Sequence, residues 1–259
     1  MAAVLVACFS LSLVLTQGQS NPFSYSSNGA DWTGVCSSAK EQSPIDLSSY
    51  DEVDSSDVGY TPLELAFAPI TTFQWEHEWR HYQFLGSHGN MKMNNITMEC
   101  VEFHFHAPSD HHLHGTQYPL ELHIGFLMPG AATYGGLAVF FEEGAEHPGL
   151  TPLIVANPTV ADLSLFFPST KIDDYYSYHG SFTNPPCTEI LQWYVSGQVL
   201  QASSAQIEFF RARWEKDPSF ASGKGNNRTP QPLNGRKVIH YSDFAFLLAP
   251  AFGLLALLS

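Results

Sequence analysis

Alternating hydrophobic and polar positions dominate the middle of the chain and predict β-strands. Residues 101–106 and 120–126 alternate with a period of two, so each presents polar side chains on one face and apolar ones on the other. Shorter apolar or aromatic runs at residues 73–84, 136–141 and 190–195 predict further strands. This pattern favours a mainly β fold.

The other segments add little regular structure. Residues 42–47 indicate a turn that enters a short strand, and residues 168–178 indicate a loop rich in tyrosine. Helical spacing of apolar residues is clear in residues 202–214, where a serine can cap the first turn. The chain has 259 residues, 44% of them hydrophobic, and no stretch that resembles a linker. We therefore expect a single domain with one large core.

Three histidines lie on the polar faces of the two alternating segments. His104 and His106 share a face of the first, and His123 lies on the second. If the strands pair antiparallel, the three imidazoles meet. Three neutral imidazoles suit zinc and leave a fourth position open, which favours a catalytic site over a structural one. Each of these rings sits on an otherwise apolar strand, where an unpartnered polar group is costly.

Two glutamates share those polar faces. Glu121 lies on the face of His123 and can accept the second proton of its ring, which fixes the tautomer. Glu102 stands beside His104 in the same way. Three histidines lie between the two strands: His111, His112 and His114. They are interpreted as solvated loop residues, which is the usual role of histidines in a His-rich tract.

The charge balance argues against a nucleic-acid partner. The formal net charge is −14, from 25 acidic and 11 basic residues. Such a surface repels a phosphate backbone and is typical of a protein kept soluble outside the cell.

The N-terminal segment predicts secretion. Residues 1–19 are apolar and then turn polar, which indicates a signal peptide rather than the alternative, a buried helix. Three cysteines lie outside the predicted signal peptide: Cys36, Cys100 and Cys187. In an oxidising compartment two of them can pair. Asn95 and Asn227 begin N-glycosylation sequons. We expect a secreted protein or one on the extracellular face of the plasma membrane.

The C-terminal tail, residues 242–259, is the second targeting candidate. Its last sixteen residues carry no charge, are too short for a comfortable membrane span of about 20 residues, and match the removable tail of a GPI-anchor signal. The alternative is a hydrophobic tail packed on the domain. The expected organisation is thus a leader at 1–19, a domain at 20–241, and a tail that tethers the protein to a membrane.

Several motifs occur in an order typical of one known family, and the chain resembles the α-class carbonic anhydrases over about residues 23–240. The motifs are QSPIDL at 42–47, HFH at 104–106, PSDHHLHGTQYPLELH at 108–123, GLAVF at 136–140, GSFTNPPCTE at 180–189 and PQPLNGR at 230–236.

The resemblance implies a large, mostly antiparallel twisted β-sheet with short surrounding helices and a conical zinc cleft. It implies that His104, His106 and His123 bind Zn²⁺. The implied activity is that of a carbonic anhydrase: reversible hydration of CO2 to bicarbonate and a proton through attack of zinc-bound hydroxide. Sulfonamides and anions are the implied inhibitors.

The resemblance also assigns catalytic positions, two of them altered. Thr183 matches a threonine that hydrogen-bonds the zinc-bound hydroxide and donates to a buried acid. That acid is usually glutamate, but here the matching residue is Asp110, whose alternative role is to begin a turn. Glu102 stands where glutamine is usual, and its negative charge is expected to raise the pKa of the zinc-bound water.

The CO2 pocket carried over from the resemblance has an apolar wall of Val139, Phe182, Leu191 and Trp193. Gly125 stands where a valine is common, so the pocket is expected to be reshaped. Core packing is the alternative role for Val139 and Trp193.

The resemblance further implies a proton shuttle and a disulfide. Aligning the imidazole of the family shuttle selects His88, whereas aligning its glycine selects Asn90. Cys36 and Cys187 occupy positions that form a disulfide in secreted members, which leaves Cys100 as a buried thiol.

The sequence also allows two other functions. The first is a carbonic-anhydrase-related binding or matrix protein with low or no turnover. The second is a metal-storing surface protein that binds several zinc ions through the loop histidines at 111, 112 and 114.

Overall fold

A computed structural model describes most of the chain. The described residues are 23–54, 56–57, 59–76, 82–130, 133–215, 221, 223 and 225–243. The expected leader at 1–19, and the expected tail from residue 244 onward, lie outside them. Within these ranges no helix is long and apolar enough to cross a membrane.

Strands make up most of the regular structure. In chain order they are β1 (Asp51–Val53), β2 (Leu63–Phe67), β3 (Gln74–Glu76), β4 (Tyr82–Met93), β5 (Ile96–His106), β6 (His112–Leu113), β7 (Thr116–Gln117), β8 (Leu120–Leu127), β9 (Tyr134–Glu143), β10 (Lys171–Ile172), β11 (Asp174–Gly180), β12 (Leu191–Ser196), β13 (Leu200–Ala202) and β14 (Ile239–Ser242). The helices of the described residues are α2 (Val35–Ser38), the 3-10 helix η1 (Leu163–Phe166) and α3 (Ser204–Glu215).

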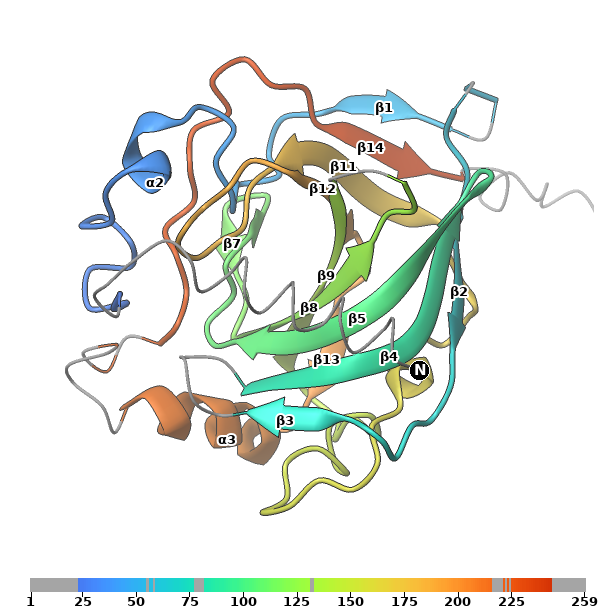
Figure 1. Cartoon of the computed structure of the whole chain (residues 1–259), viewed down its shortest axis with the longest axis vertical. Helices are drawn as coiled ribbons and strands as arrows, with labels where there is room; N and C mark the ends of the chain where they lie inside the picture. Colours follow the sequence, from blue (N-terminus) through green and yellow to red (C-terminus); the bar gives the residue numbers. More distant parts are fainter. Residues whose placement is uncertain are drawn as a thin grey trace, which may run out of the picture.

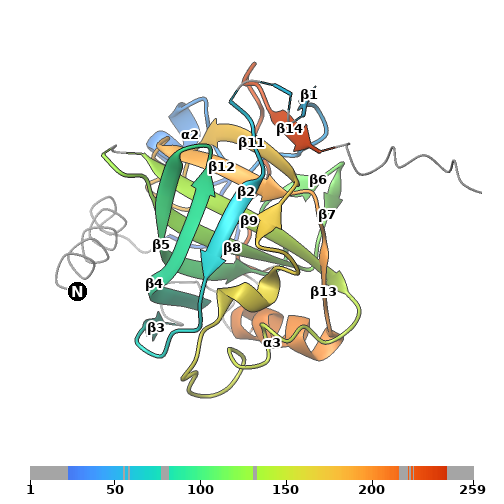
Figure 2. The same cartoon turned by 90° about the vertical axis from the view of Figure 1, so that its right-hand side faces the viewer.

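Twelve strands form one curled sheet (Figure 1). The main path runs β1-β14-β11-β12-β9-β8-β5-β4-β2-β10, with β13 paired to β9 and β3 paired to β4. Most pairs are antiparallel, and the parallel ones are β1–β14, β12–β9 and β13–β9. Figure 2 shows β5, β4 and β2 side by side. The expected mainly β fold with a large, mostly antiparallel sheet is confirmed.

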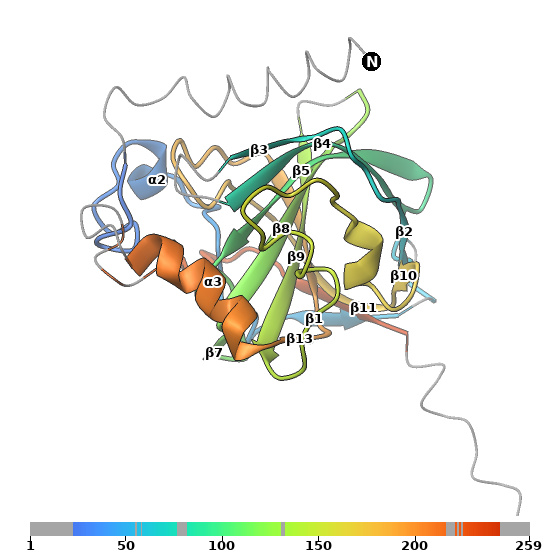
Figure 3. The same cartoon turned by 90° about the horizontal axis from the view of Figure 1, so that it is seen from below.

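The two faces of the sheet bury different sets of side chains. Phe103 and Phe105 of β5 point into the larger apolar cluster, together with residues of α3 and η1. The rings of Phe105 and Phe210 are 4.6 Å apart, which anchors α3 to that face. Figure 3 shows the helix crossing beneath the sheet. The predicted helix is confirmed, and its apolar stripe is what packs on the sheet.

The two alternating segments pair as expected. β5 and β8 run antiparallel, and His104 lies directly opposite His123. The prediction of a loop at residues 168–178 is wrong, because this segment contains β10 and most of β11. β11 pairs with β12 and β14, so its strand state depends on partners distant in sequence, which local composition does not show.

The disulfide Cys36–Cys187 implied by the resemblance is present and closes a sequence separation of 151 residues. Cys100 is a buried free thiol, as expected. Bridges that close long loops typically stabilise a fold by about 2–4 kcal/mol. This one ties the segment that carries Thr183 to the N-terminal part of the domain.

A buried arginine makes a second link to the N-terminal segment. The guanidinium of Arg228 donates to Oε1 of Gln42 at 2.9 Å, to the carbonyl of Ser43 at 2.6 Å and to the carbonyl of Cys36 at 2.8 Å. The charge-assisted bonds offset part of the cost of burying this cation. They fix the QSPIDL motif against the chain that precedes β14.

The two sequons differ in accessibility. Asn95 is exposed in the turn between β4 and β5, where a glycan can extend into solvent. Asn227 is only 7% exposed, and its Oδ1 accepts a hydrogen bond from Nδ2 of Asn28 at 3.0 Å. Asn227 is thus largely buried in the folded chain, whereas Asn95 is open to solvent, and a glycan at either position stays a prediction.

Candidate metal centre

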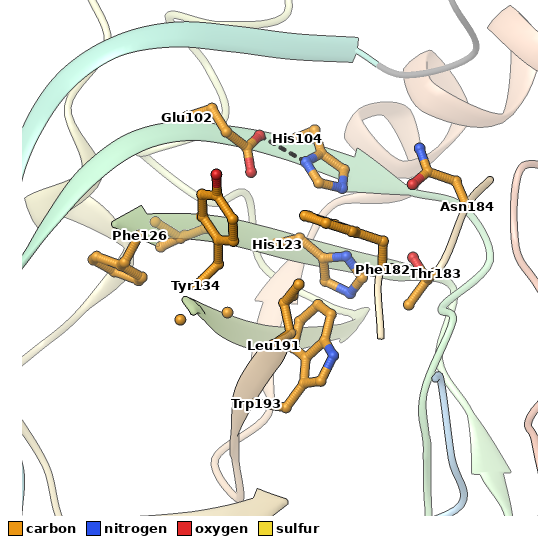
Figure 4. Close-up of a pocket in the computed structure, with 14 residues that line it drawn as sticks. Glu102, His104, His123, Phe126, Tyr134, Phe182, Thr183, Asn184, Leu191 and Trp193 are labelled. Carbon is orange, nitrogen blue, oxygen red and sulfur yellow. Dashed lines mark hydrogen bonds and ion pairs between the residues drawn. The ribbon is translucent and has the colours of Figure 1, made fainter. Parts of the chain in front are cut away.

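Three histidines converge on one face of the sheet. His104, His106 and His123 each offer a ring nitrogen, and these atoms lie within 4.8 Å of one another. The ring centroids are 5.1, 5.2 and 4.5 Å apart. The period of β5 places the first two rings on one face, and the register with β8 brings in the third. Figure 4 shows the rings of His104 and His123 on neighbouring strands.

Glutamates hold the outer nitrogens of two of these rings. Nδ1 of His104 lies 2.8 Å from Oε2 of Glu102, and Nε2 of His123 lies 2.8 Å from Oε1 of Glu121. An ionised carboxylate only accepts hydrogen bonds, so each of these nitrogens carries the ring proton. The opposite nitrogen of each ring keeps a lone pair for a metal.

A backbone carbonyl does the same for the third ring. Nδ1 of His106 donates to the carbonyl of Asn226 at 2.8 Å. The Asn226 side chain is itself fixed, because its Oδ1 accepts from the amide of Ala107 and its Nδ2 donates to the carbonyl of Phe105. Gly225 allows this approach, since its φ is +92° and a Cβ there would overlap the Ala107 carbonyl. Sequence reasoning missed Asn226.

The imidazole of His111 extends the network behind Glu121. Nδ1 of His111 lies 2.6 Å from Oε1 of Glu121, and its Nε2 lies 2.7 Å from the hydroxyl of Tyr178. That hydroxyl donates to Oγ of Ser43 at 3.0 Å. His111 is fully buried, so its interpretation as a solvated loop residue is wrong. His111, Glu121 and His123 are also close enough together to be considered as metal ligands. The hydrogen bonds from the two rings to Glu121 explain this closeness without a metal.

Burial sets the protonation of this cluster. It lowers the pKa of His106 and of His123, which favours the neutral imidazoles that bind metals. Burial alone raises the pKa of Glu121, but the adjacent imidazoles of His111 and His123 outweigh it and leave the pKa below its usual value. Glu121 therefore remains a carboxylate between two rings.

Thr183 and Asp110 lie at the edge of the histidine cluster. Asp110 is fully buried, which raises its pKa, and its Oδ1 accepts from the backbone amide of Arg228 at 2.7 Å. Oδ2 lies 3.5 Å from Nε2 of His106 and has no well-formed hydrogen bond to a described residue. The Thr183 side chain is near enough to lower the pKa of Asp110, against the larger effect of burial.

A cavity lies beside the histidines, with about 450 Å³ of empty space when the open solvent at its mouth is included. Four of the five residues expected to shape the pocket line it: Gly125, Phe182, Leu191 and Trp193. Figure 4 shows the last three beside the histidines. The cavity lining also includes Glu102, His104, His123, Ile124, Phe126, Tyr134, Gly135, Gly136, Thr183 and Asn184. The cavity is thus largely apolar, with the metal-binding candidates at one side.

Val139 is the exception, and the prediction that it forms part of the pocket wall is wrong. It pairs with Leu122 and belongs to the apolar cluster on the opposite face of the sheet. A shift of one residue in register moves a strand side chain to the other face. Gly136, directly opposite Gly125, takes the wall position, and a Cβ there would lie 2.8 Å from the ring of Trp193.

Comparison with known proteins identifies the family. A family model described as eukaryotic-type carbonic anhydrase matches residues 27–242. The chain belongs to this family. The carbonic anhydrase of Pectobacterium atrosepticum is 32% identical over 256 residues, which covers 92% of this chain and 97% of that protein.

Solved structures agree with this carbonic anhydrase fold. The α-carbonic anhydrase of Thermovibrio ammonificans, in complex with the inhibitor sulfanilamide, is 30% identical with a TM-score of 0.65, covering 79% of this chain and 89% of that one. Dioscorin complexed with ascorbate has a TM-score of 0.73 at 22% identity, covering 86% of this chain and 99% of that one. The second likeness shows the fold alone.

The structure of this carbonic anhydrase removes His88 as a shuttle candidate. The side chain is 1% exposed, and its ring centroid is 4.8 Å from that of Phe103. Burial lowers the pKa of His88 to about 4, so the ring stays neutral at physiological pH. Asn90 is exposed on β4 opposite Glu99, and neither candidate lines the described pocket. The register between β4 and β5 is irregular between Leu85 and Gly89, the stretch that contains His88.

His88 is instead expected to destabilise the fold in acid. Its pKa is about 4 when folded and about 6.5 when unfolded. The unfolded chain therefore binds more protons in this range, and stability falls as the pH drops from about 6.5 to about 4, by about 3 kcal/mol in all. We expect His88→Leu to gain about 2 kcal/mol relative to the unaltered protein between pH 7.5 and pH 5. Urea unfolding of the metal-free proteins measures this difference.

Exposed His179, which pairs with Glu41 at the surface, provides the control variant His179→Leu. Stability curves of the His88→Leu and unaltered proteins that stay parallel from pH 7.5 to pH 5 would contradict the assignment.

Proposed function

We propose that the protein is a zinc-dependent carbonic anhydrase that interconverts CO2 and bicarbonate. The observation that carries this proposal is the set of three imidazoles beside an apolar cavity, each with its outer nitrogen held by a carboxylate or a carbonyl. The general reaction of the family is the hydration of CO2, and the family model covers nearly the whole described domain.

The donor set fits zinc. Three neutral imidazoles suit a borderline-soft dication, and a site with three protein ligands leaves room for a substrate. His104, His106 and His123 would hold the ion. Bound zinc lowers the pKa of its water to about 7, as has long been established for this family, and so supplies a nucleophile near neutral pH.

The surrounding residues orient the ligands and the nucleophile. Glu102, Glu121 and the Asn226 carbonyl fix the ring tautomers. The hydroxyl of Thr183 is proposed to donate a hydrogen bond to the Asp110 carboxylate. The lone pairs of the Thr183 oxygen then face the reaction centre. The carboxylate at position 102, in place of the usual glutamine, is proposed to raise the pKa of the nucleophile.

The cavity wall is proposed to select the substrate. Phe182, Leu191 and Trp193 present apolar surfaces next to the histidines. Such surfaces accept a neutral, apolar gas and offer no hydrogen bonds to hold a bicarbonate anion. The wall thus favours entry of CO2 and release of the product.

A second candidate is a related binding protein with low turnover. Asp110 favours it, because the acid is shorter than the usual glutamate and its Oδ2 lacks a well-formed hydrogen bond to a described residue. Storage of several zinc ions is less well supported, since His111 is buried in the network of Glu121.

We also propose that the protein is secreted, and that its tail at 242–259 tethers it to the outer face of the plasma membrane. The disulfide suits an oxidising compartment, and Asn95 is accessible to a glycan. Sulfonamides are the proposed inhibitors, by analogy with the sulfanilamide complex of the Thermovibrio relative.

One experiment separates the candidate functions. Protein purified from a secreting host is analysed for zinc per chain and for CO2 hydration, with and without sulfanilamide. One zinc per chain with inhibitable hydration is the expected result. One zinc without hydration supports the binding protein, several zinc ions support storage, and a protein that takes up no zinc refutes the proposal.

A further inference from the structure

Gly125 lies between two strands beside the candidate ligands. It is directly opposite Glu102 of β5 on one side and Gly136 of β9 on the other. It is not among the glycines with positive φ, so the backbone at this position is one that any residue adopts. The local conformation therefore does not require glycine, and the space around its Cα is the remaining reason for it.

The Glu102 side chain fills that space. A Cβ at position 125 would overlap Oε1 of Glu102 and would lie 3.0 Å from Cδ and 3.1 Å from Cγ of the same side chain. The three nearest atoms thus all belong to Glu102. They form the far end of a flexible side chain, so an alanine at position 125 would displace the carboxylate rather than the strand.

That carboxylate is engaged through its other oxygen. Oε2 of Glu102 accepts from Nδ1 of His104 at 2.8 Å and from Nε2 of Gln83 at 3.1 Å. The His104 side chain is 17% exposed, compared with 0% for His106 and 3% for His123. Packing holds His104 least among the three rings, so its orientation depends most on the bond to Glu102.

We propose that Gly125 is a positioning residue of the metal site. By lacking a side chain, it leaves the space in which the Glu102 carboxylate holds the His104 ring with its proton on Nδ1 and Nε2 available to the metal. The proposal rests on the proposed zinc site for its effect on affinity, but the contact that it invokes is present without metal.

The test compares the full-length protein with four variants: Gly125→Ala, Glu102→Ala, the double variant and Gly86→Ala. Gly86 is the matched control, because it lies in β4 and a Cβ there would meet Cβ of Phe73 at 3.3 Å and not the metal site. Competition with a chromogenic chelator measures zinc affinity. Nitrogen-15 chemical shifts of the histidine rings in the metal-free proteins show which nitrogen of His104 carries the proton.

We expect Gly125→Ala to weaken zinc binding about 10- to 100-fold, the usual effect of losing the group that orients a ligand. The double variant should bind zinc as Glu102→Ala does, because the displaced group is already absent. Gly86→Ala should leave the affinity unchanged. In the metal-free proteins, His104 should be protonated on Nδ1 with glycine at position 125 and should lose this preference with alanine.

Unchanged zinc affinity in Gly125→Ala would overturn the proposal, as would losses in Gly125→Ala and Glu102→Ala that multiply in the double variant. If the unaltered protein binds no zinc, the proposed function fails, whereas the proton on His104 still decides the role of Gly125. An Nδ1 proton that persists in Gly125→Ala overturns that role on its own.

Discussion

Replacing His104 with alanine is expected to remove bound zinc and reduce CO2 hydration to background. Loss of a group behind a ligand typically costs 10- to 100-fold in metal affinity, so loss of the ligand itself should cost more than about 100-fold. His104 is the preferred position because it is the least buried ligand, and its removal leaves the network of Glu121 intact. Zinc content by mass spectrometry and stopped-flow hydration measure the two effects.

The control for this change is His179→Ala, which removes an exposed histidine of β11 that contacts Glu41. It should keep both zinc and activity. Full zinc occupancy in His104→Ala would mean that His104 is not a ligand.

Replacing Thr183 with alanine is expected to lower kcat/KM by about 100-fold or more while zinc stays bound. The proposed hydroxyl orients the nucleophile and acts in the transition state, and removal of one such group typically costs about 10²–10³-fold. The change removes no metal ligand, so zinc affinity should remain near that of the unaltered protein. Thr183→Ser keeps the hydroxyl and should retain most of the activity.

Asp110→Asn tests the partner of that hydroxyl. If the two side chains act as a unit, the double variant Thr183→Ala/Asp110→Asn should be no slower than Thr183→Ala alone. Effects that multiply would mean that Asp110 acts independently, for example through its contact with His106. Equal activity of Thr183→Ala and the unaltered protein would exclude the orienting role.

The sequence predicts the histidine triad well because strand alternation is a local property. His104 and His106 are two residues apart, and their shared face follows from the period of β5 alone. The placement of His123 needed only the antiparallel pairing of β5 with β8, two strands close in sequence. The surrounding fold class follows from the same pattern.

Features that depend on register or distant backbone were not predictable. The misplacement of Val139 is a shift of one strand position, and His88 follows the irregularity in β4. The support of His106 comes from a backbone carbonyl 120 residues away, and a carbonyl has no signature in a sequence. In the sequence His111 cannot be told apart from half-buried His112 and exposed His114, and it differs from them only in its buried partners.

Arg228, which links the N-terminal segment to the chain before β14, also affects how the protein loses activity when it is damaged. The Arg228 backbone amide binds Asp110, while its guanidinium binds the carbonyls of Cys36 and Ser43. Reduction of the Cys36–Cys187 disulfide followed by trimming of the N-terminal segment would remove the Cys36 carbonyl from a buried cation whose own peptide group holds the acid next to Thr183. Turnover would then be lost to limited proteolysis before the sheet opens, so residual activity would report damage at the domain's periphery earlier than spectroscopic signals of secondary structure.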